Sequence, residues 1–203
     1  MQIFKSVFLL LAASMLTLGS LSFAQDEVPE GFDPELWTEG RRVFNEIGGM
    51  GCAGCHGTFG ANELGGHPVI RGDDIDVDRI HGAVEGMQAM VFLQALISDD
   101  EIEAVAHYIS YLGTMEPLVV TQRREAFEIP EGDPVLPADT HVQLILYNQD
   151  RAACTWTVDG IDTEPVVIGG RQIDALDWVT AETGTVEAYC AERPDDRLSL
   201  TLQ

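Results

Sequence analysis

The chain has 203 residues, and its 34 acidic against 11 basic residues give a net charge of −23. This length suits one or two domains, and the charge excludes nucleic acid as a partner because its phosphates would be repelled. The charge is spread over both halves, −13 over residues 25–125 and −11 over residues 126–203. Such an even spread favours adaptation to salty surroundings, although recognition by charge would select a partner with a basic docking face.

The first 24 residues have the pattern of a secretory signal peptide. Lys5 precedes an apolar run over residues 7–18, and Ser22-Phe23-Ala24 puts small residues at the −3 and −1 positions of a cleavage site. Cleavage would remove the one lysine and leave ten arginines, a net charge of −24. No later segment is apolar enough to span a membrane. We therefore expect an exported, periplasmic protein in which residues 25–33 form a short leader.

Capping signals and apolar periodicity predict helices in the first half of the chain. The first helix begins at Asp33-Pro34-Glu35 and ends at Gly48-Gly49, and the second covers residues 76–85. The third begins at the capping box Ser98-Asp99-Asp100-Glu101 and ends at Gly113. Repeated glycines leave residues 57–74 as a loop.

A Cys-x-x-Cys-His motif, Cys52-Ala53-Gly54-Cys55-His56, follows the first predicted helix. Two thiols at this spacing can each add to one haem vinyl group, and the next histidine then lies under the iron as a ligand. A redox dithiol would not need His56, and zinc would need a second pair of ligands nearby. The motif occurs once, so we expect one covalently attached haem c.

Residues 34–113 resemble a class I (His/Met) cytochrome c, an all-α fold. Gly40 and Phe44 match the family's N-terminal helix where it crosses the C-terminal helix, and Tyr108 matches the aromatic partner there. Pro68-Val69-Ile70-Arg71-Gly72 resembles the family's Pro-x-Leu-x-Gly stretch. The resemblance implies that the carbonyl of Pro68 accepts the Nδ1 proton of His56 and so orients the ligand.

The resemblance also implies a methionine as the second axial ligand of the iron. Met90 lies between Gly86 and the last predicted helix, as the family's ligand does, although Val91 stands where proline is usual. Met87 is the alternative. Three histidines are weaker candidates for this ligand: His67, His81 and His107. The methionines Met50 and Met115 are poorly placed for it.

The second half of the chain changes character. Prolines make residues 114–140 a predicted linker, and short alternating segments over residues 141–203 predict a small all-β, sandwich-like domain. The stretch 184–190 resembles the last strands of cupredoxins, but a blue-copper site needs two histidines and a cysteine, and His141 is the one histidine after residue 113. Cys154 and Cys190 are the two cysteines outside the motif, and in an exported protein we expect them to form a disulfide.

Together these features predict a monohaem electron carrier and not an enzyme. It would pass single electrons to or from a periplasmic redox enzyme or a respiratory chain, or serve as the dedicated subunit of such an enzyme, with the β domain as a docking module. The alternative is a haem enzyme or a gas sensor with an open sixth position. A closed His/Met pair favours the carrier, because the iron then has no position for a substrate.

Overall fold

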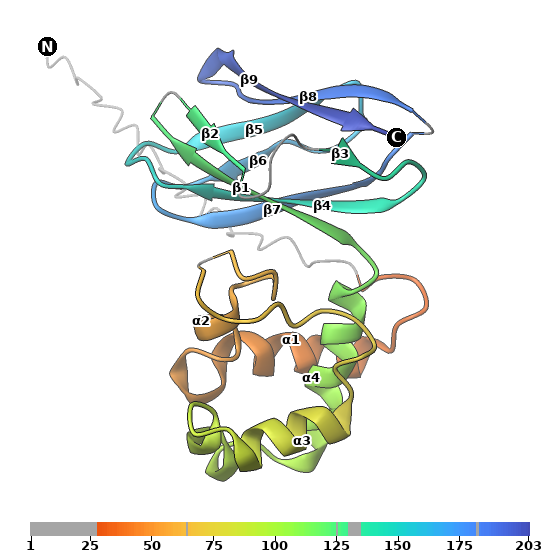
Figure 1. Cartoon of the computed structure of the whole chain (residues 1–203), viewed down its shortest axis with the longest axis vertical. Coiled ribbons are helices and arrows are strands. Elements are labelled where there is room, and N and C mark those ends of the chain that lie inside the picture. Colours follow the sequence, from red (N-terminus) through yellow and green to blue (C-terminus); the bar gives the residue numbers. More distant parts are fainter. Residues whose placement is uncertain (1–27, 64, 125, 130–134, 182) are drawn as a thin grey trace, which may run out of the picture.

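The structure is a computed structural model that describes residues 28–63, 65–124, 126–129, 135–181 and 183–203. A helical part occupies one end of the molecule and two β-sheets occupy the other (Figure 1). We call residues 28–113 the helical part and residues 116–203 the β part. The predicted signal peptide and residues 25–27 of the predicted leader lie outside the described residues.

The helical part contains four α-helices and two short 3-10 helices within the described residues. They are α1 (Pro34–Glu46), η1 (Ile47–Gly49), α2 (Ala53–His56), α3 (Val77–Gly86), η2 (Val91–Ala95) and α4 (Asp99–Leu112). The predicted starts of α1 and α4 are confirmed, with Asp33 accepting hydrogen bonds at the first and a reciprocal Ser98–Glu101 capping box at the second. In the part of the chain that the structure describes, no helix is both long and apolar enough for a membrane span.

The helices α1 and α4 cross at Gly40. A Cβ atom on Gly40 would collide with the backbone carbonyl of Ala104 and the Cβ of Tyr108, so this residue must lack a side chain for the helices to approach so closely. Phe44 packs edge-on against Tyr108 with ring centroids 5.4 Å apart, and both residues are buried. The crossing therefore has the form that the sequence predicted.

The β part contains nine strands among the described residues. They are β1 (Glu116–Arg123), β2 (Ala126–Glu128), β3 (Val135–Leu136), β4 (His141–Asn148), β5 (Cys154–Asp159), β6 (Val166–Ile168), β7 (Ile173–Val179), β8 (Gly184–Cys190) and β9 (Arg193–Leu202). One sheet has the order β2-β1-β4-β7 and the other β3-β9-β8-β5-β6.

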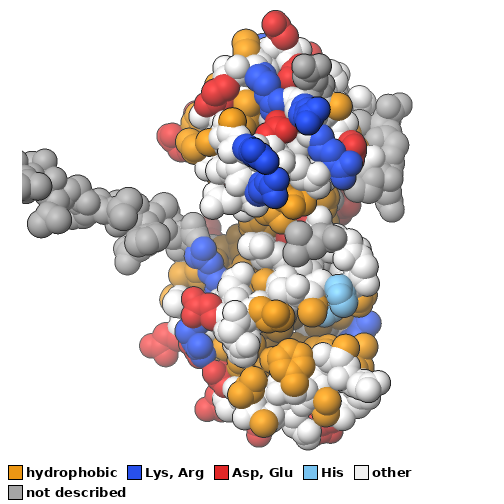
Figure 2. Space-filling model, turned by 90° about the vertical axis from the view of Figure 1, so that its left-hand side faces the viewer, with side chains coloured by type: hydrophobic (Ala, Val, Ile, Leu, Met, Phe, Trp, Pro, Cys, Tyr) orange, Lys and Arg blue, Asp and Glu red, His pale blue; other side chains and the backbone are white. Residues whose placement is uncertain are grey.

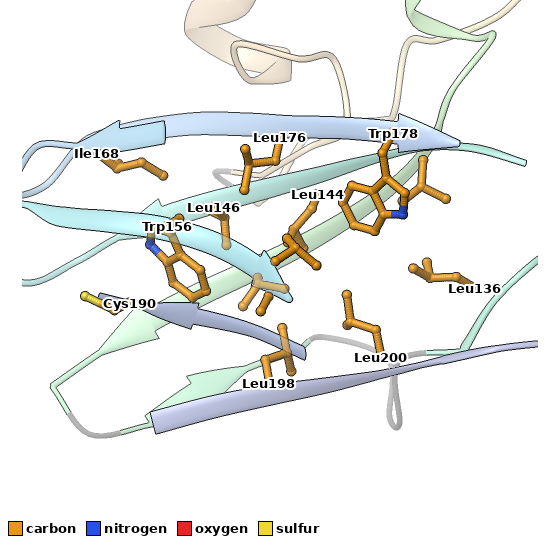
Figure 3. Packing of buried hydrophobic residues seen from close by; sticks show 14 of the residues in the cluster. Leu136, Leu144, Leu146, Trp156, Ile168, Leu176, Trp178, Cys190, Leu198 and Leu200 are labelled. Carbon is orange, nitrogen blue, oxygen red and sulfur yellow. The ribbon is translucent and has the colours of Figure 1, made fainter. Parts of the chain in front are cut away.

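The two sheets share one hydrophobic core. Leu144, Leu146 and Leu176 from the first sheet point toward Trp156 and Leu200 from the second (Figure 3). Buried side chains alternate with more exposed ones along β5 and along the end of β9, which is the pattern of a sheet with one buried face. Strand β4 is different, because residues 142–146 are all buried and both of its faces are therefore covered. The predicted disulfide between Cys154 and Cys190 is confirmed, and it joins the neighbouring strands β5 and β8 within the second sheet.

The segment interpreted as a linker, residues 114–140, contains three strands. β1 pairs in parallel with β4, from Glu116 opposite Val142 to Gln122 opposite Asn148, and β3 pairs in parallel with β9. The prolines of this segment suggested irregular chain, but Leu118-Val119-Val120 is apolar and contains two β-branched valines. Its partner strand lies more than twenty residues away. Parallel pairing over such a distance leaves no local turn signal in the sequence.

Arg71 joins the helical part to the β part. Its Nη1 donates to the carbonyl of Phe59 at 2.7 Å and to Oε1 of Gln143 in β4 at 2.8 Å. Its Nη2 donates to the carbonyls of Leu112 and, at 3.1 Å, of Met115. Burial lowers the pKa of Arg71 to about 10, so the guanidinium is charged at neutral pH. One side chain thus fixes a loop, the end of α4 and a central strand of the first sheet.

The substitution Gly40→Ala tests the close crossing of α1 and α4. We expect the new methyl group to lower the free energy of unfolding by about 1–3 kcal/mol through overpacking, measured by urea denaturation. Gly82→Ala in α3 is the matched control, since its Cβ would meet nothing within 4 Å. It should raise the free energy of unfolding by about 0.5–1 kcal/mol. Similar effects of the two substitutions would contradict the crossing described above.

The substitution Arg71→Leu tests the joint between the two parts. It leaves the carbonyls of Leu112 and Met115 without this donor, and we expect a loss of about 2–4 kcal/mol of stability. Because the link to Gln143 is lost as well, calorimetry should show two separate unfolding transitions in place of one. Arg79→Leu, which removes an exposed ion pair with Asp74, should cost less than about 1 kcal/mol. A single unshifted transition in Arg71→Leu would refute the joint.

Candidate functional site

The Cys-x-x-Cys-His motif lies on one turn of helix. The His56 amide donates to the Cys52 carbonyl at 2.9 Å, and this turn brings residues 52, 55 and 56 to one face, as the i, i+3 and i+4 spacing requires. Gly51 precedes it with φ 60°, and a Cβ there would collide with the backbone of Phe44. The end of α1 and this glycine therefore set the direction from which the motif enters.

His56 is held in one tautomer. The ring is buried, and its Nδ1 lies 2.9 Å from the carbonyl oxygen of Pro68. A carbonyl can only accept a hydrogen bond, so Nδ1 must carry the proton, and in the neutral ring Nε2 then keeps its lone pair. This is the contact that the resemblance implied for Pro68. It leaves Nε2 as the atom that can bind a metal.

The two cysteines of the motif are free thiols in the structure. Burial raises the pKa of the Cys52 thiol to about 11, so the thiol is neutral at physiological pH. Reactive dithiols and zinc sites need the opposite, a lowered pKa that favours the thiolate. The environment of Cys52 therefore does not favour the thiolate that a redox dithiol or a zinc site needs.

The loop over residues 57–72 is irregular but firmly braced. Buried Glu63 accepts hydrogen bonds from the backbone amides of Phe59 and Ala61, at 2.6 and 3.1 Å. The Gly72 amide donates to the carbonyl of Ile109 in α4 at 3.0 Å. The supporting roles of Glu63 and Arg71 in this loop could not be predicted from the sequence, because neither role has a local signal. The bracing holds Pro68, and through it the ring of His56.

Hydrophobic side chains gather around a hollow on one face of the helical part (Figure 2). Nine large hydrophobic residues are exposed in the described part of the chain, and six of them belong to the helical part. We call these six the hydrophobic face: Met50, Val69, Met87, Val91, Phe92 and Leu96. A Cβ on Gly48 would contact Phe92 and Leu96, so the segment before the motif lies beside η2. Apolar surroundings of this kind fit a large, flat, hydrophobic cofactor such as haem.

The candidate axial methionines lie between α3 and η2. Met90 is half-buried and packs against the core of the helical part, whereas Met87 is half-exposed at the end of α3. Both belong to one short turn, in which the Met90 amide donates to the Met87 carbonyl at 2.8 Å. Met115 is buried, and Met50 lies against Gly54 of the motif.

The other histidines have different surroundings. Nε2 of His107 accepts a hydrogen bond from the Asp33 amide at 3.2 Å, and Nε2 of His81 lies 3.7 Å from Oδ1 of Asp99. The ring of His67 lies 5.8 Å from that of His56, but His67 is exposed. His107 therefore has its acceptor nitrogen occupied at the start of α1.

The β part shows no arrangement suited to copper among its described residues. His141 lies 3.0 Å from Asp177. The described residues bring together one group of three potential ligands, Cys154, Cys190 and Glu192, and its two cysteines are joined in the disulfide. A blue-copper site needs a free thiolate with two histidines, and these residues do not provide it.

Several solved structures are distantly similar to part of the chain. Auracyanin B shares 16% identity over 43% of this chain and 88% of that chain, with a TM-score of 0.36. Auracyanin from the photosynthetic bacterium Roseiflexus castenholzii shares 10% identity over 45% of this chain and 99% of that chain, also with a TM-score of 0.36. A purple cupredoxin from Nitrosopumilus maritimus shares 14% identity over 43% of this chain and 99% of that chain, with a TM-score of 0.30. These likenesses are too distant to support a conclusion about fold or function.

No curated protein matches the sequence. Residues 35–109 match the family model described as cytochrome c oxidase, cbb3-type, subunit III. The matched range runs from α1 to α4 and contains the Cys52–His56 motif, Pro68 and Met90. This match supports a cytochrome c domain over residues 35–109.

Proposed function

We propose that this protein is an exported, periplasmic, monohaem cytochrome c that carries single electrons to or from a redox enzyme or a respiratory chain. The observation that carries the proposal is the hydrogen bond from His56 Nδ1 to the Pro68 carbonyl, at 2.9 Å. This bond fixes the proton on Nδ1 and leaves Nε2 free to bind a metal. The two thiols of the motif lie beside it at the spacing that haem attachment needs.

Each residue of the site has a distinct role in this proposal. Cys52 and Cys55 would tether the haem covalently, His56 would ligate the iron, and Met90 would supply the second protein ligand, with Met87 as the alternative. Pro68 orients the His56 ring, because its carbonyl oxygen accepts a hydrogen bond from the Nδ1–H group. The bound haem supplies the one-electron chemistry, and the chain fixes the ligands and keeps water away through its apolar surroundings.

A His/Met pair favours electron transfer over catalysis. With both ligands supplied by the protein, a substrate or a gas would find no open position on the iron. The fixed ring of His56 and the braced loop over residues 57–72 also limit the rearrangement that accompanies a change of charge at the iron. An open sixth position would instead suit a haem enzyme or a gas sensor, and the ligand test below separates these functions.

The partner is proposed from the family and from charge. The matched family model is named for a subunit of a cbb3-type cytochrome c oxidase, which supports a respiratory redox complex as the partner. The protein would reach this complex as a diffusing carrier or belong to it as a dedicated subunit. The net charge of −24 after cleavage favours a basic docking face on at least one partner, with an encounter rate that falls as salt rises.

The substitution Met90→Ala tests the closed haem. A ferric absorption band near the red edge of the spectrum marks methionine ligation, and we expect Met90→Ala to abolish it and to allow carbon monoxide to bind. Met87→Ala is the matched control, because it removes the same side chain three residues away, and it should leave the band in place.

Two results would contradict this assignment. If the band is lost in Met87→Ala and kept in Met90→Ala, the ligand is Met87, and the carrier proposal stands with the other methionine. If the unaltered protein binds carbon monoxide readily, its sixth position is open, and the enzyme or sensor function replaces the carrier.

A further inference from the structure

Five of the ten arginines that follow the predicted signal peptide lie together at one end of the β part. We call them the arginine patch: Arg123, Arg124, Arg151, Arg171 and Arg193. They line three adjoining shallow hollows that share Arg124 and Asp150. Figure 2 shows basic side chains gathered on the β part. The chain has a net charge of −23, so a cluster of basic side chains is unexpected from its composition.

The patch is assembled from four connections of the sandwich. Arg123 ends β1 and Arg124 follows it, Arg151 lies between β4 and β5, Arg171 lies between β6 and β7, and Arg193 begins β9. These connections are packed closely, since a Cβ on Gly170 would collide with the backbone of Arg151. The fold therefore holds cationic side chains from distant parts of the sequence at fixed places on one surface.

The acidic groups within the patch are already engaged. Asp150 accepts a hydrogen bond from the Arg124 amide at 2.8 Å and pairs with Arg193 at 3.0 Å. Glu192 accepts hydrogen bonds from the amide and hydroxyl of Thr155, both at 2.8 Å. Arg123 pairs with Glu128. The side chains of Arg124, Arg151 and Arg171 are exposed and make no ion pair or hydrogen bond with the other described residues, so three guanidinium groups face solvent.

Two of these three arginines occupy strained backbone positions. Four non-glycine residues in the described ranges have positive φ, and two of them, Asn62 and Asp139, are of types that tolerate it. The other two are Arg124, with φ 47°, and Arg171, with φ 64°. Glycine or asparagine would fit both turns with less strain. An arginine kept at such a position points to a role for its side chain.

We propose that the arginine patch docks a carboxylate-rich surface of an acidic redox partner protein. Guanidinium groups bind carboxylates through paired hydrogen bonds, and arginine suits such contacts better than lysine. The proposal rests on the electron-carrier function proposed above. A carrier meets both a donor and an acceptor: the acidic remainder of the surface fits a basic partner, and the patch fits an acidic one.

The shape of the patch favours an extended acidic surface over a small anion or a lipid. Asp150 lines all three hollows, so a single anion at their centre would meet a carboxylate, whereas an acidic segment can contact the arginines around it. A membrane surface would need apolar side chains for insertion, and the lining residues at this end include none larger than alanine apart from Cys190 of the disulfide.

Basic side chains of the β part and hydrophobic side chains of the helical part are visible from the same side of the molecule (Figure 2). A partner bound to these basic side chains would therefore extend toward the hydrophobic side chains of the helical part. The β part would then act as the element that orients the partner toward the haem-binding part.

The test is calorimetric titration of the haem-loaded protein with a short polyglutamate peptide at low salt. The variant Arg124→Gly, Arg151→Gln, Arg171→Gly removes the three solvent-facing guanidinium groups and also relieves both strained turns. We expect about tenfold weaker binding with an unchanged or higher melting temperature. The control Arg42→Gln, Arg79→Gln, Arg197→Gln removes the same charge from ion-paired arginines elsewhere and should bind within about twofold of the unaltered protein.

Several outcomes would overturn the proposal. One is the absence of saturable binding of polyglutamate to the unaltered protein, and another is the loss of the same fraction of affinity for it in both triple variants. Equimolar inorganic phosphate that fully displaces the peptide would also overturn the proposal, as would binding to phosphatidylglycerol vesicles without binding to the peptide. Arg151→Gln alone leaves both strained turns unchanged and should weaken binding too, which guards against loss through unfolding. The absorption spectrum of each sample reports the haem separately, so failure of the electron-carrier function is distinguishable from failure of the patch.

Discussion

The guanidinium group of Arg71 is the contact on which the arrangement of the molecule depends. It reaches the carbonyl of Phe59 after the Cys-x-x-Cys-His motif, the end of α4, and Gln143 in the first sheet. An arginine with four such bonds in a largely buried place is costly to disrupt, since each carbonyl it leaves would lose its donor. The loop that carries Pro68, and with it the ring of His56, is therefore fixed to both parts of the protein.

The parts of the fold that depend on neighbouring residues could be predicted from the sequence. The Ser98–Glu101 capping box, the crossing at Gly40 and the disulfide between Cys154 and Cys190 were all predicted and are present. Strand β1 was missed because its parallel partner lies far along the chain. The roles of Glu63 and Arg71 were missed for a similar reason, since each depends on contacts that exist once the loop has folded.

The candidate site divides in the same way. The motif and Pro68 have fixed spacing, and the hydrogen bond from His56 joins them in the structure. The identity of the second iron ligand could not be settled from spacing, because Met87 and Met90 belong to the same short turn. The choice depends on which of the two side chains would face the iron. The arginine patch had no signal in the sequence at all, because its five residues come from four connections of the β part. Overall composition had instead suggested a uniformly acidic surface.

The central claim is that His56 and the two thiols hold one covalent haem, and the intact mass of the purified, exported protein tests it most directly. The account predicts the mass of the cleaved chain plus one haem, with the haem retained after acid extraction and neither Cys52 nor Cys55 open to alkylation. A mass equal to that of the polypeptide alone, with both thiols alkylated, would contradict the account and leave a dithiol or metal site in its place.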